Sequence, residues 1–204
     1  MRVKDKSVWG FGINDAEYAV TKYGDVLGKH IQTWMCPIYT VWKNMITRCY
    51  SPIQLNKHPT YIECAVCPSW QRFSSFRDWM MTQDWEGKTL DKDLISIGNR
   101  IYSPEFCIFI EADLNVFLVD RAASRGDYPV GVYWNIRDKK YQAKCCNPFT
   151  GRRDYLGYYD CPNVAHEVWR KRKHELACAY AEQQTDERIA DALRNRYSIY
   201  REKY

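Results

Sequence analysis

The chain has 204 residues, of which 46% are hydrophobic and 15% aromatic, so it can form a core in one large domain or two small ones. An apolar run of about 18 residues and a signal-peptide core are both missing, which argues against a transmembrane helix and predicts a cytoplasmic protein. The net charge of +5 is uneven: residues 1–120 hold 13 Lys and Arg against 14 Asp and Glu (−1), and residues 121–204 hold 17 against 11 (+6). A basic C-terminal part predicts a polyanionic partner or, in the plainer interpretation, a solvated basic surface.

Two helices are predicted in the first half of the chain. Over residues 34–50 apolar side chains recur at the spacing of one helical face, and Ser51-Pro52 ends the pattern. Aromatic side chains at three-residue intervals predict a second helix over residues 70–83, with those side chains directed inward. A loop containing His58 separates the two helices.

A small β structure is predicted next. Residues 89–94 alternate polar and apolar positions as a strand does, and the chain then turns and returns from Ile101. Residues 107–110 predict an apolar strand and residues 113–121 a short amphipathic helix. Residues 122–129 contain a glycine and a proline and predict the linker to a second module.

The second module is predicted to be a three-stranded antiparallel sheet covered by a helix. The predicted strands are 131–135, 141–145 and 154–159. Pro162 suits the first turn of a helix, and apolar side chains recur at helical spacing as far as Leu176, so one helix face should lie on the sheet. The basic side chains of the strands and turns fall where this helix leaves the sheet bare.

The motifs Gly131-Val132-Tyr133-Trp134-Asn135, Lys140-Tyr141-Gln142-Ala143, Tyr155-Leu156-Gly157-Tyr158-Tyr159-Asp160 and Ala165-His166-Glu167 resemble an Apetala-two-type (ethylene-response-factor-like) DNA-binding domain. In that family the sheet lies in the DNA major groove, which a ribbon of strands fits. The resemblance implies double-stranded DNA as the partner; the alternative is a sheet used only for protein contacts. The side chains expected to contact DNA are Trp134, Arg137, Lys139, Lys144, Arg152 and Arg153.

Four of the nine cysteines are candidates for a structural zinc site. Cys64 and Cys67 have the spacing of half a tetrahedral site, and Cys107 would supply a third thiolate. Cys49 or His58 would complete the set and tie a helix, a loop and a hairpin together. The alternative is that these are ordinary buried thiols.

The run Leu90-Asp91-Lys92-Asp93, followed by Gly98-Asn99-Arg100 and Cys107, resembles the ββα-metal hairpin of HNH nucleases. In that family an acidic residue binds Mg²⁺, a histidine activates water and an asparagine supports the site. The resemblance implies that Asp91 binds Mg²⁺, with Asp93 or Asn99 close by, to hydrolyse a phosphodiester.

At the position where the HNH histidine is expected, this chain has Lys92. A lysine between two aspartates is protonated at pH 7 and cannot accept a proton. His58 could enter the site from its loop instead. Three alternatives remain: the hairpin cleaves DNA with another base, it holds DNA without cleaving, or it is a structural turn.

The order of motifs over residues 34–177 also resembles phage-encoded HNH-type (homing) endonucleases with an Apetala-two-like domain. The resemblance rests on Arg48-Cys49-Tyr50-Ser51, Trp85-Glu86-Gly87-Lys88 and the motifs named above. We therefore expect an α+β protein with a zinc-stapled HNH-like module at 1–125 and a DNA-binding module with a C-terminal helix at 126–204. The expected function is site-preferring, Mg²⁺-dependent DNA cleavage in a bacterial cytoplasm. The alternative is a non-catalytic DNA-binding regulator, or a phage protein that inhibits a host protein.

Overall fold

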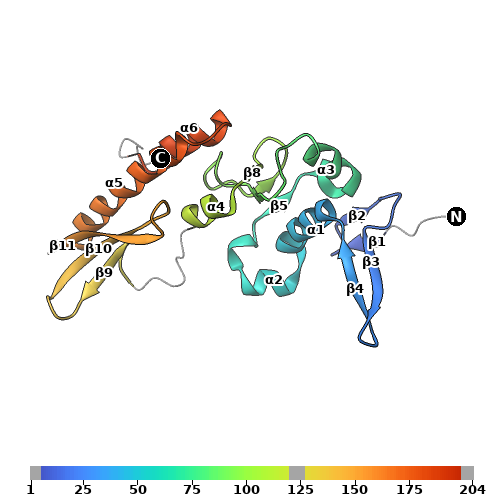
Figure 1. The fold of residues 1–204 in the computed structure, drawn as a ribbon, viewed down its shortest axis with the longest axis horizontal. Helices are drawn as coiled ribbons and strands as arrows, with labels where there is room; N and C mark the ends of the chain where they lie inside the picture. The colour runs from blue at the N-terminus through green and yellow to red at the C-terminus, as the bar shows by residue number, and fades with distance from the viewer. Residues whose placement is uncertain (1–5, 120–126, 199–204) are drawn as a thin grey trace. The chain divides into compact units, whose positions relative to one another are not determined.

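The structure, a computed structural model, describes residues 6–119 and 127–198. It is a mixed α+β protein with a three-stranded antiparallel sheet, which confirms these two parts of the predicted fold class (Figure 1). The chain divides into two compact units, Met1–Ile110 and Glu111–Tyr204. The boundary expected at 125/126 lies outside the described residues, and the observed division comes before the preceding helix rather than after it.

The first unit contains four small two-stranded sheets. Its strands are β1 (Lys6–Val8), β2 (Gly12–Asn14), β3 (Thr21–Val26), β4 (Lys29–Met35), β5 (Ala65–Val66), β6 (Thr89–Asp91), β7 (Ile101–Tyr102) and β8 (Ile108–Ile110). The pairs β1–β2, β3–β4 and β6–β8 are antiparallel, and β5–β7 is parallel. The return strand of the β6 hairpin is therefore β8, not the predicted segment at Ile101, which pairs with β5 instead.

Both predicted helices of this unit are present but shorter than expected. The helices are α1 (Pro37–Tyr50), α2 (Pro52–Lys57) and α3 (Phe73–Met80), with 3-10 turns at Pro59–Tyr61 and Pro68–Gln71. Helix α1 begins only at Pro37 because residues 34 and 35 belong to β4. Its apolar stripe is buried as predicted, with Trp42 and Ile46 fully inaccessible.

Aromatic side chains from α1, α3 and the turn before α3 form the core of the first unit. The Trp42 and Phe73 rings lie edge to face with centroids 5.6 Å apart, and Trp42 Nε1 donates to the Trp70 carbonyl oxygen at 2.8 Å. Gly12 packs so closely on this cluster that a Cβ there would lie 2.9 Å from the Trp42 ring. Edge-to-face rings and a satisfied indole N–H make such a core specific as well as apolar.

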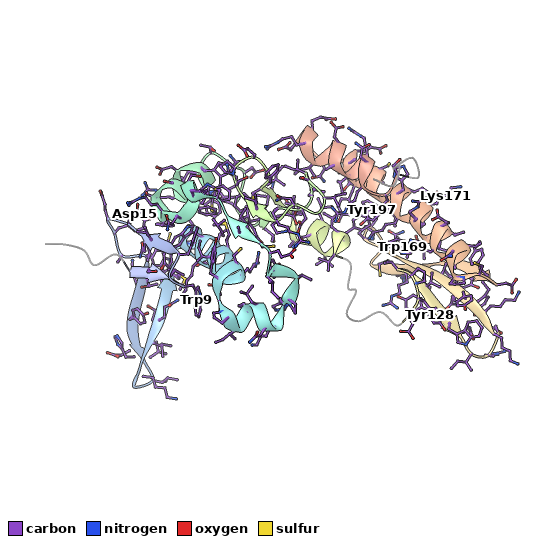
Figure 2. All side chains as sticks on the ribbon, turned by 180° about the vertical axis from the view of Figure 1, so that it is seen from behind. Trp9, Asp15, Tyr128, Trp169, Lys171 and Tyr197 are labelled. Carbon is purple, nitrogen blue, oxygen red and sulfur yellow. The ribbon has the colours of Figure 1, made fainter. Side chains whose placement is uncertain are left out.

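A side chain from the N-terminal segment caps α3. Asp15 accepts hydrogen bonds from the Ser74 backbone N–H at 2.8 Å and the Ser74 hydroxyl at 2.7 Å (Figure 2). Burial raises the pKa of Asp15, but these bonds from Ser74 outweigh it and leave the pKa below its usual value. The carboxylate therefore stabilises the first turn of the helix, where backbone N–H groups lack helical partners.

The second unit is the predicted sheet with helices around it. Its elements are α4 (Ala112–Leu118), β9 (Val132–Asn135), β10 (Lys140–Asn147), β11 (Arg152–Tyr159), α5 (Pro162–Ala181) and α6 (Glu187–Arg196). The sheet is antiparallel, as predicted, and its strand order is β11-β10-β9. Helix α5 runs along one face of it, with Val132, Ala143 and Ala165 buried between them (Figure 1).

Gly131 fixes how closely the chain before β9 approaches α5. A Cβ at this position would lie 2.0 Å from the ring of Trp169 on α5, and the backbone has φ +78° (Figure 2). Only glycine fits both conditions. His166, one turn earlier on α5, lies with Nδ1 2.9 Å from the Val130 carbonyl oxygen and stacks on the Trp169 ring.

Helix α4, expected to belong to the first module, packs on α5 of the second. The buried Lys173 Nζ donates to the Phe117 carbonyl oxygen at 2.7 Å, and the Tyr180 hydroxyl donates to Asp113 at 2.9 Å. The Phe117 and Tyr180 rings have centroids 5.3 Å apart. On a further part of α5, helix α6 is held by buried side chains that include Leu193.

Among the described residues, no helix combines the length and the apolar character that crossing a bilayer requires.

Candidate nucleic-acid interface and candidate hydrolytic site

The strand register separates the two faces of the β9–β11 sheet. Val132 lies opposite Ala143, and both are buried beneath α5. Tyr133, the next residue of β9, lies opposite Gln142, which in turn lies opposite Tyr158 on β11. Because successive side chains of a strand point to opposite faces, these residues lie on the face away from α5. We call this face the outer sheet face; it comprises Tyr133, Asn135, Lys140, Gln142, Lys144, Cys146, Arg153, Tyr155 and Tyr158.

Tyrosine rings and positive charges alternate on the outer sheet face. Lys144 Nζ lies 5.9 Å from the centroid of the Tyr133 ring, and the Tyr155 and Tyr158 rings have centroids 5.6 Å apart. Asn135 donates to the Tyr158 hydroxyl at 2.7 Å across the width of the sheet. A register shift between Ala143 and Lys144 marks a β-bulge, which increases the local twist of the sheet.

The cations on the sheet differ from those on the helices beneath it. None of the sheet side chains Arg137, Lys139, Lys144, Arg152 and Arg153 forms an ion pair with a described residue. On the helices, by contrast, four arginines are paired with carboxylates at 2.6–2.9 Å, and on the sheet Lys140 is paired with Asp160 at 3.3 Å. The arginines of the sheet and its first turn therefore differ from these four helix arginines. The helix pairs are Arg170–Glu167, Arg172–Asp154, Arg172–Glu175, Arg188–Asp186, Arg194–Glu187 and Arg194–Asp191.

Five of the six side chains predicted to contact DNA lie at or near this face. Arg137 and Lys139 lie in the turn between β9 and β10, where Lys139 has φ +49°. Lys144 lies in the middle of the outer sheet face. Arg152 and Arg153 open β11 and are exposed.

The placement of Trp134 is a correction. Trp134 lies opposite Tyr141 in the register and shares the face of Val132 and Ala143, with ring centroids of Trp134 and Tyr141 4.8 Å apart. It therefore belongs to the edge of the helix-covered face, although it is 40% exposed. Tyr133, which the sequence analysis did not select, takes its place on the outer sheet face. Strand alternation counted from the buried Val132 would have found it.

Three of the five predicted hydrolytic residues, Lys92, Asp93 and Asn99, line a pocket of about 530 Å³ in the first unit. Lys92 is only 7% exposed, and its Nζ donates to Asp93 at 2.6 Å and to the Asn99 carbonyl oxygen at 2.8 Å. The Asn99 amide nitrogen donates back to the Lys92 carbonyl oxygen at 3.0 Å. Residues that line the pocket include Pro59, Cys64, Lys92, Asp93, Asn99 and Arg100.

Lys92 is held in its charged form. Burial lowers the pKa of Lys92, but the hydrogen bond and negative charge of Asp93 outweigh this effect and raise the pKa above its ordinary value. A lysine with a raised pKa stays protonated at neutral pH and cannot take a proton from water. His58, the alternative base, is exposed at the end of α2 and is not among the side chains that line the pocket.

Asp91, the predicted Mg²⁺ ligand, has a structural role in this arrangement. One of its carboxylate oxygens accepts from the backbone N–H groups of Asp93 at 2.8 Å and Leu94 at 2.7 Å. It therefore closes the turn after β6, much as an Asx motif does. Asp93 and Asn99 are nearer to the pocket, since both are among its lining residues and Asp91 is not.

Sequence reasoning missed Arg48 and Tyr102 beside this site. Burial raises the pKa of Tyr102, while Arg48, which is hydrogen-bonded to its hydroxyl, lowers it; burial prevails. Lys92 Nζ lies 5.8 Å from the centroid of the Tyr102 ring. The apolar stripe of α1 predicts that Arg48 is a solvent-facing residue, so no local signal indicates this contact.

The four candidate zinc ligands do not form one site as they lie. Burial is the main cause that raises the pKa of Cys49 to about 12, and the neighbouring Cys64 adds to it. Burial is also the main cause that raises the pKa of Cys107 to about 12. Cys67 Sγ lies 3.1 Å from the Ser69 hydroxyl. Within the described part of the chain, no three His, Cys, Asp or Glu side chains are arranged to hold a metal. The zinc site stays a prediction.

Comparisons of the chain with family models, with curated proteins and with solved structures each gave no significant match. The resemblances to HNH nucleases and to Apetala-two-type domains therefore stay predictions.

Proposed function

We propose that this chain binds double-stranded DNA through the outer sheet face. The observation that carries the proposal is the charge pattern of the second unit. Four helix arginines are neutralised by carboxylates, and Lys140 of the sheet pairs with Asp160, whereas the other five sheet and turn cations form no ion pair with a described residue. Cations without protein partners can neutralise DNA phosphates and release counterions, which is the main source of affinity in such interfaces. Three tyrosines among them offer apolar and hydrogen-bonding contacts to base edges and sugars.

The shape of the sheet supports a groove-bound arrangement. A narrow antiparallel sheet fits the major groove of B-form DNA, and the turn cations Arg137 and Lys139 would then meet the backbone at the groove edge. Lys144 and Arg153 lie on the face itself and are the candidates for contacts inside the groove. The site of action that accompanies this proposal is the cytoplasm of a bacterial host.

The test is binding of a short mixed-sequence duplex, measured by fluorescence anisotropy over a series of salt concentrations. The double variant Lys144→Gln/Arg153→Gln should bind more weakly by roughly ten-fold or more and lower the salt slope by about two. The matched control, Arg194→Gln, removes a helix cation already paired with Glu187 and should change neither quantity. An unchanged salt slope in the double variant would exclude the outer sheet face as the interface.

Mg²⁺-dependent cleavage by the Lys92 pocket is a second candidate, because Asp93 and Asn99 line an open pocket beside Arg100. Asp93, with Asn99, would hold the metal that stabilises charge on a phosphodiester; Lys92 would not act as the base. The alternative is a non-catalytic DNA-binding regulator, or a phage protein that inhibits a host protein.

Incubation of supercoiled plasmid with the protein and Mg²⁺ separates these candidates. Nicking that Asp93→Asn abolishes while duplex binding persists would support cleavage. Asp93→Asn is a sharper probe than Asp91→Ala, because Asp91 closes a backbone turn and its loss would disturb the fold. Tight binding without nicking would exclude cleavage and support the DNA-binding regulator.

A further inference from the structure

The β3–β4 hairpin protrudes from the first unit with little packed against it. Residues 25–34 are all exposed, and Figure 1 shows the hairpin extending away from α1 and the neighbouring strands. An isolated two-stranded hairpin gains little stability from burial. Core packing therefore constrains its side chains less than those of the core, and they can serve contacts with another molecule.

The residue at the tip is unfavourable for the hairpin itself. Leu27 is 98% exposed and has φ +52°, and Gly28 follows with φ +75°. Two consecutive residues with positive φ form the tight turn for which Asn-Gly is the preferred sequence, whereas a leucine there costs roughly 1 kcal/mol of backbone strain. Leu27 gains no burial in return, so no packing within the described part of the chain offsets this cost.

One face of the hairpin is basic and apolar. Lys22 lies opposite Trp34 with its Nζ 5.2 Å from the ring centroid, and Val26 lies opposite Lys29. Ile31, between these pairs, is 44% exposed. This face carries no carboxylate in residues 21–35, all of which the structure describes.

The one carboxylate of the hairpin is on its other face. Asp25 lies opposite His30, with Asp25 Oδ1 3.0 Å from His30 Nδ1, and Tyr23 stacks on the same histidine. The charge of the first face is therefore complementary to a polyanion.

We propose that the β3–β4 hairpin is a second DNA contact, in which Leu27 wedges between base pairs from the minor groove and Lys22 and Lys29 contact flanking phosphates. The inference rests on the proposed DNA-binding function and adds a separate contact in the first unit. Apolar wedges of this kind unstack one base step and bend the duplex toward the major groove. A bilayer is a poorer match, because even one saturated acyl chain gives only marginal membrane binding, and besides Leu27 the apolar residues Val26, Ile31 and Trp34 expose less than half of their surface.

The test is the variant Leu27→Asn in the full chain. It converts the turn to the preferred Asn-Gly, so thermal unfolding should occur at the same or a higher temperature than in the wild type. Two readouts use a short mixed-sequence duplex with a donor and an acceptor dye at its ends: anisotropy for affinity and energy transfer for bending. Leu27→Asn should weaken binding roughly ten-fold and remove the bend, because a leucine side chain is no longer buried against bases. The matched control, Ile53→Asn, changes another exposed apolar residue, on α2, and should alter neither readout.

The outcomes separate this inference from the proposed function. If Leu27→Asn binds and bends the duplex as the wild type does, the hairpin contact is excluded and the outer sheet face is unaffected. If Lys144→Gln/Arg153→Gln retains full affinity while Leu27→Asn loses it, the sheet proposal fails and the hairpin contact stands. Absence of duplex binding by the wild type overturns both proposals. Leu27-dependent binding to phosphatidylglycerol–phosphatidylcholine vesicles without duplex bending overturns the hairpin contact alone.

Discussion

Lys92 and Lys144 carry the same charge in opposite surroundings. Lys92 is buried, and its Nζ is held by Asp93 and by the Asn99 carbonyl oxygen. Lys144 stands on an open face beside a tyrosine ring, with no carboxylate among the described residues to neutralise it. The comparison teaches that a lysine within a sequence motif for chemistry can be structural, while one within an ordinary strand is free to bind. The sequence predicted the charged state of Lys92 and selected Lys144 as a DNA contact, but it did not predict the bond of Lys92 to the Asn99 carbonyl oxygen.

The largest expected effect is on stability. Lys92→Met should lower the free energy of unfolding by about 2 kcal/mol, because the buried lysine loses its ion pair with Asp93 and its hydrogen bond to the Asn99 carbonyl oxygen. Lys144→Met should stay within about 0.5 kcal/mol of the wild type, since a surface substitution breaks no such contact. Chemical denaturation of the two variants measures both values. Equal losses would remove the distinction between the two lysines.

The same contact should depend on pH in the alkaline range. Because the pKa of Lys92 is raised in the folded state, its contribution is fully present below the unfolded value of about 10.4 and is lost as the pH rises through the higher folded-state value. The stability difference between wild type and Lys92→Met should therefore be constant from neutral pH to about pH 10 and shrink above it. Unfolding curves at several pH values test this, and a difference that vanishes already near pH 8 would show that Lys92 is neutral in the folded protein.

The smallest expected effect is on the alkylation rates of individual cysteines, which distinguish buried thiols from exposed thiols covered by DNA. With iodoacetamide at mildly alkaline pH, exposed Cys146 should be alkylated readily, whereas Cys107, 1% exposed and with its pKa raised by burial to about 12, should react only on unfolding. A bound duplex should slow alkylation of Cys146 on the outer sheet face. Cys161, exposed in the loop before α5, is the internal control.

Mass spectrometry of the alkylated peptides reads out all three sites. Equal protection of Cys146 and Cys161 by DNA would contradict a footprint confined to the outer sheet face. If Cys107 became reactive in the folded protein only after treatment with a chelator, the zinc prediction would regain support.

Local patterns predicted much of the fold, since they depend on neighbours in sequence. The apolar stripe of α1 and the alternation of β9–β11 are such patterns, and both are confirmed. The pairing of β6 with β8 could not be predicted in the same way, because β7 lies between them and all three strands have only two or three residues.

The candidate sites show the same limit. The basic residues of the sheet were identifiable from composition, but the face of Trp134 depended on knowing which residue of β9 is buried first. The carboxylate of Asp15 caps a helix that begins far along the chain, and Arg48 meets Tyr102 across the core of the first unit. Contacts between distant segments leave no periodic trace in the sequence.

The close approach of Gly131 to Trp169 has a practical consequence for protein engineering. Since the helix is anchored at the near end of the sheet by a contact that admits no side chain, the outward positions of the strands can be varied without changing how the helix docks. A combinatorial library that randomises Tyr133, Gln142 and Tyr155 while retaining Gly131 would keep its scaffold. Such a library would make this small module a starting point for selecting new binding preferences.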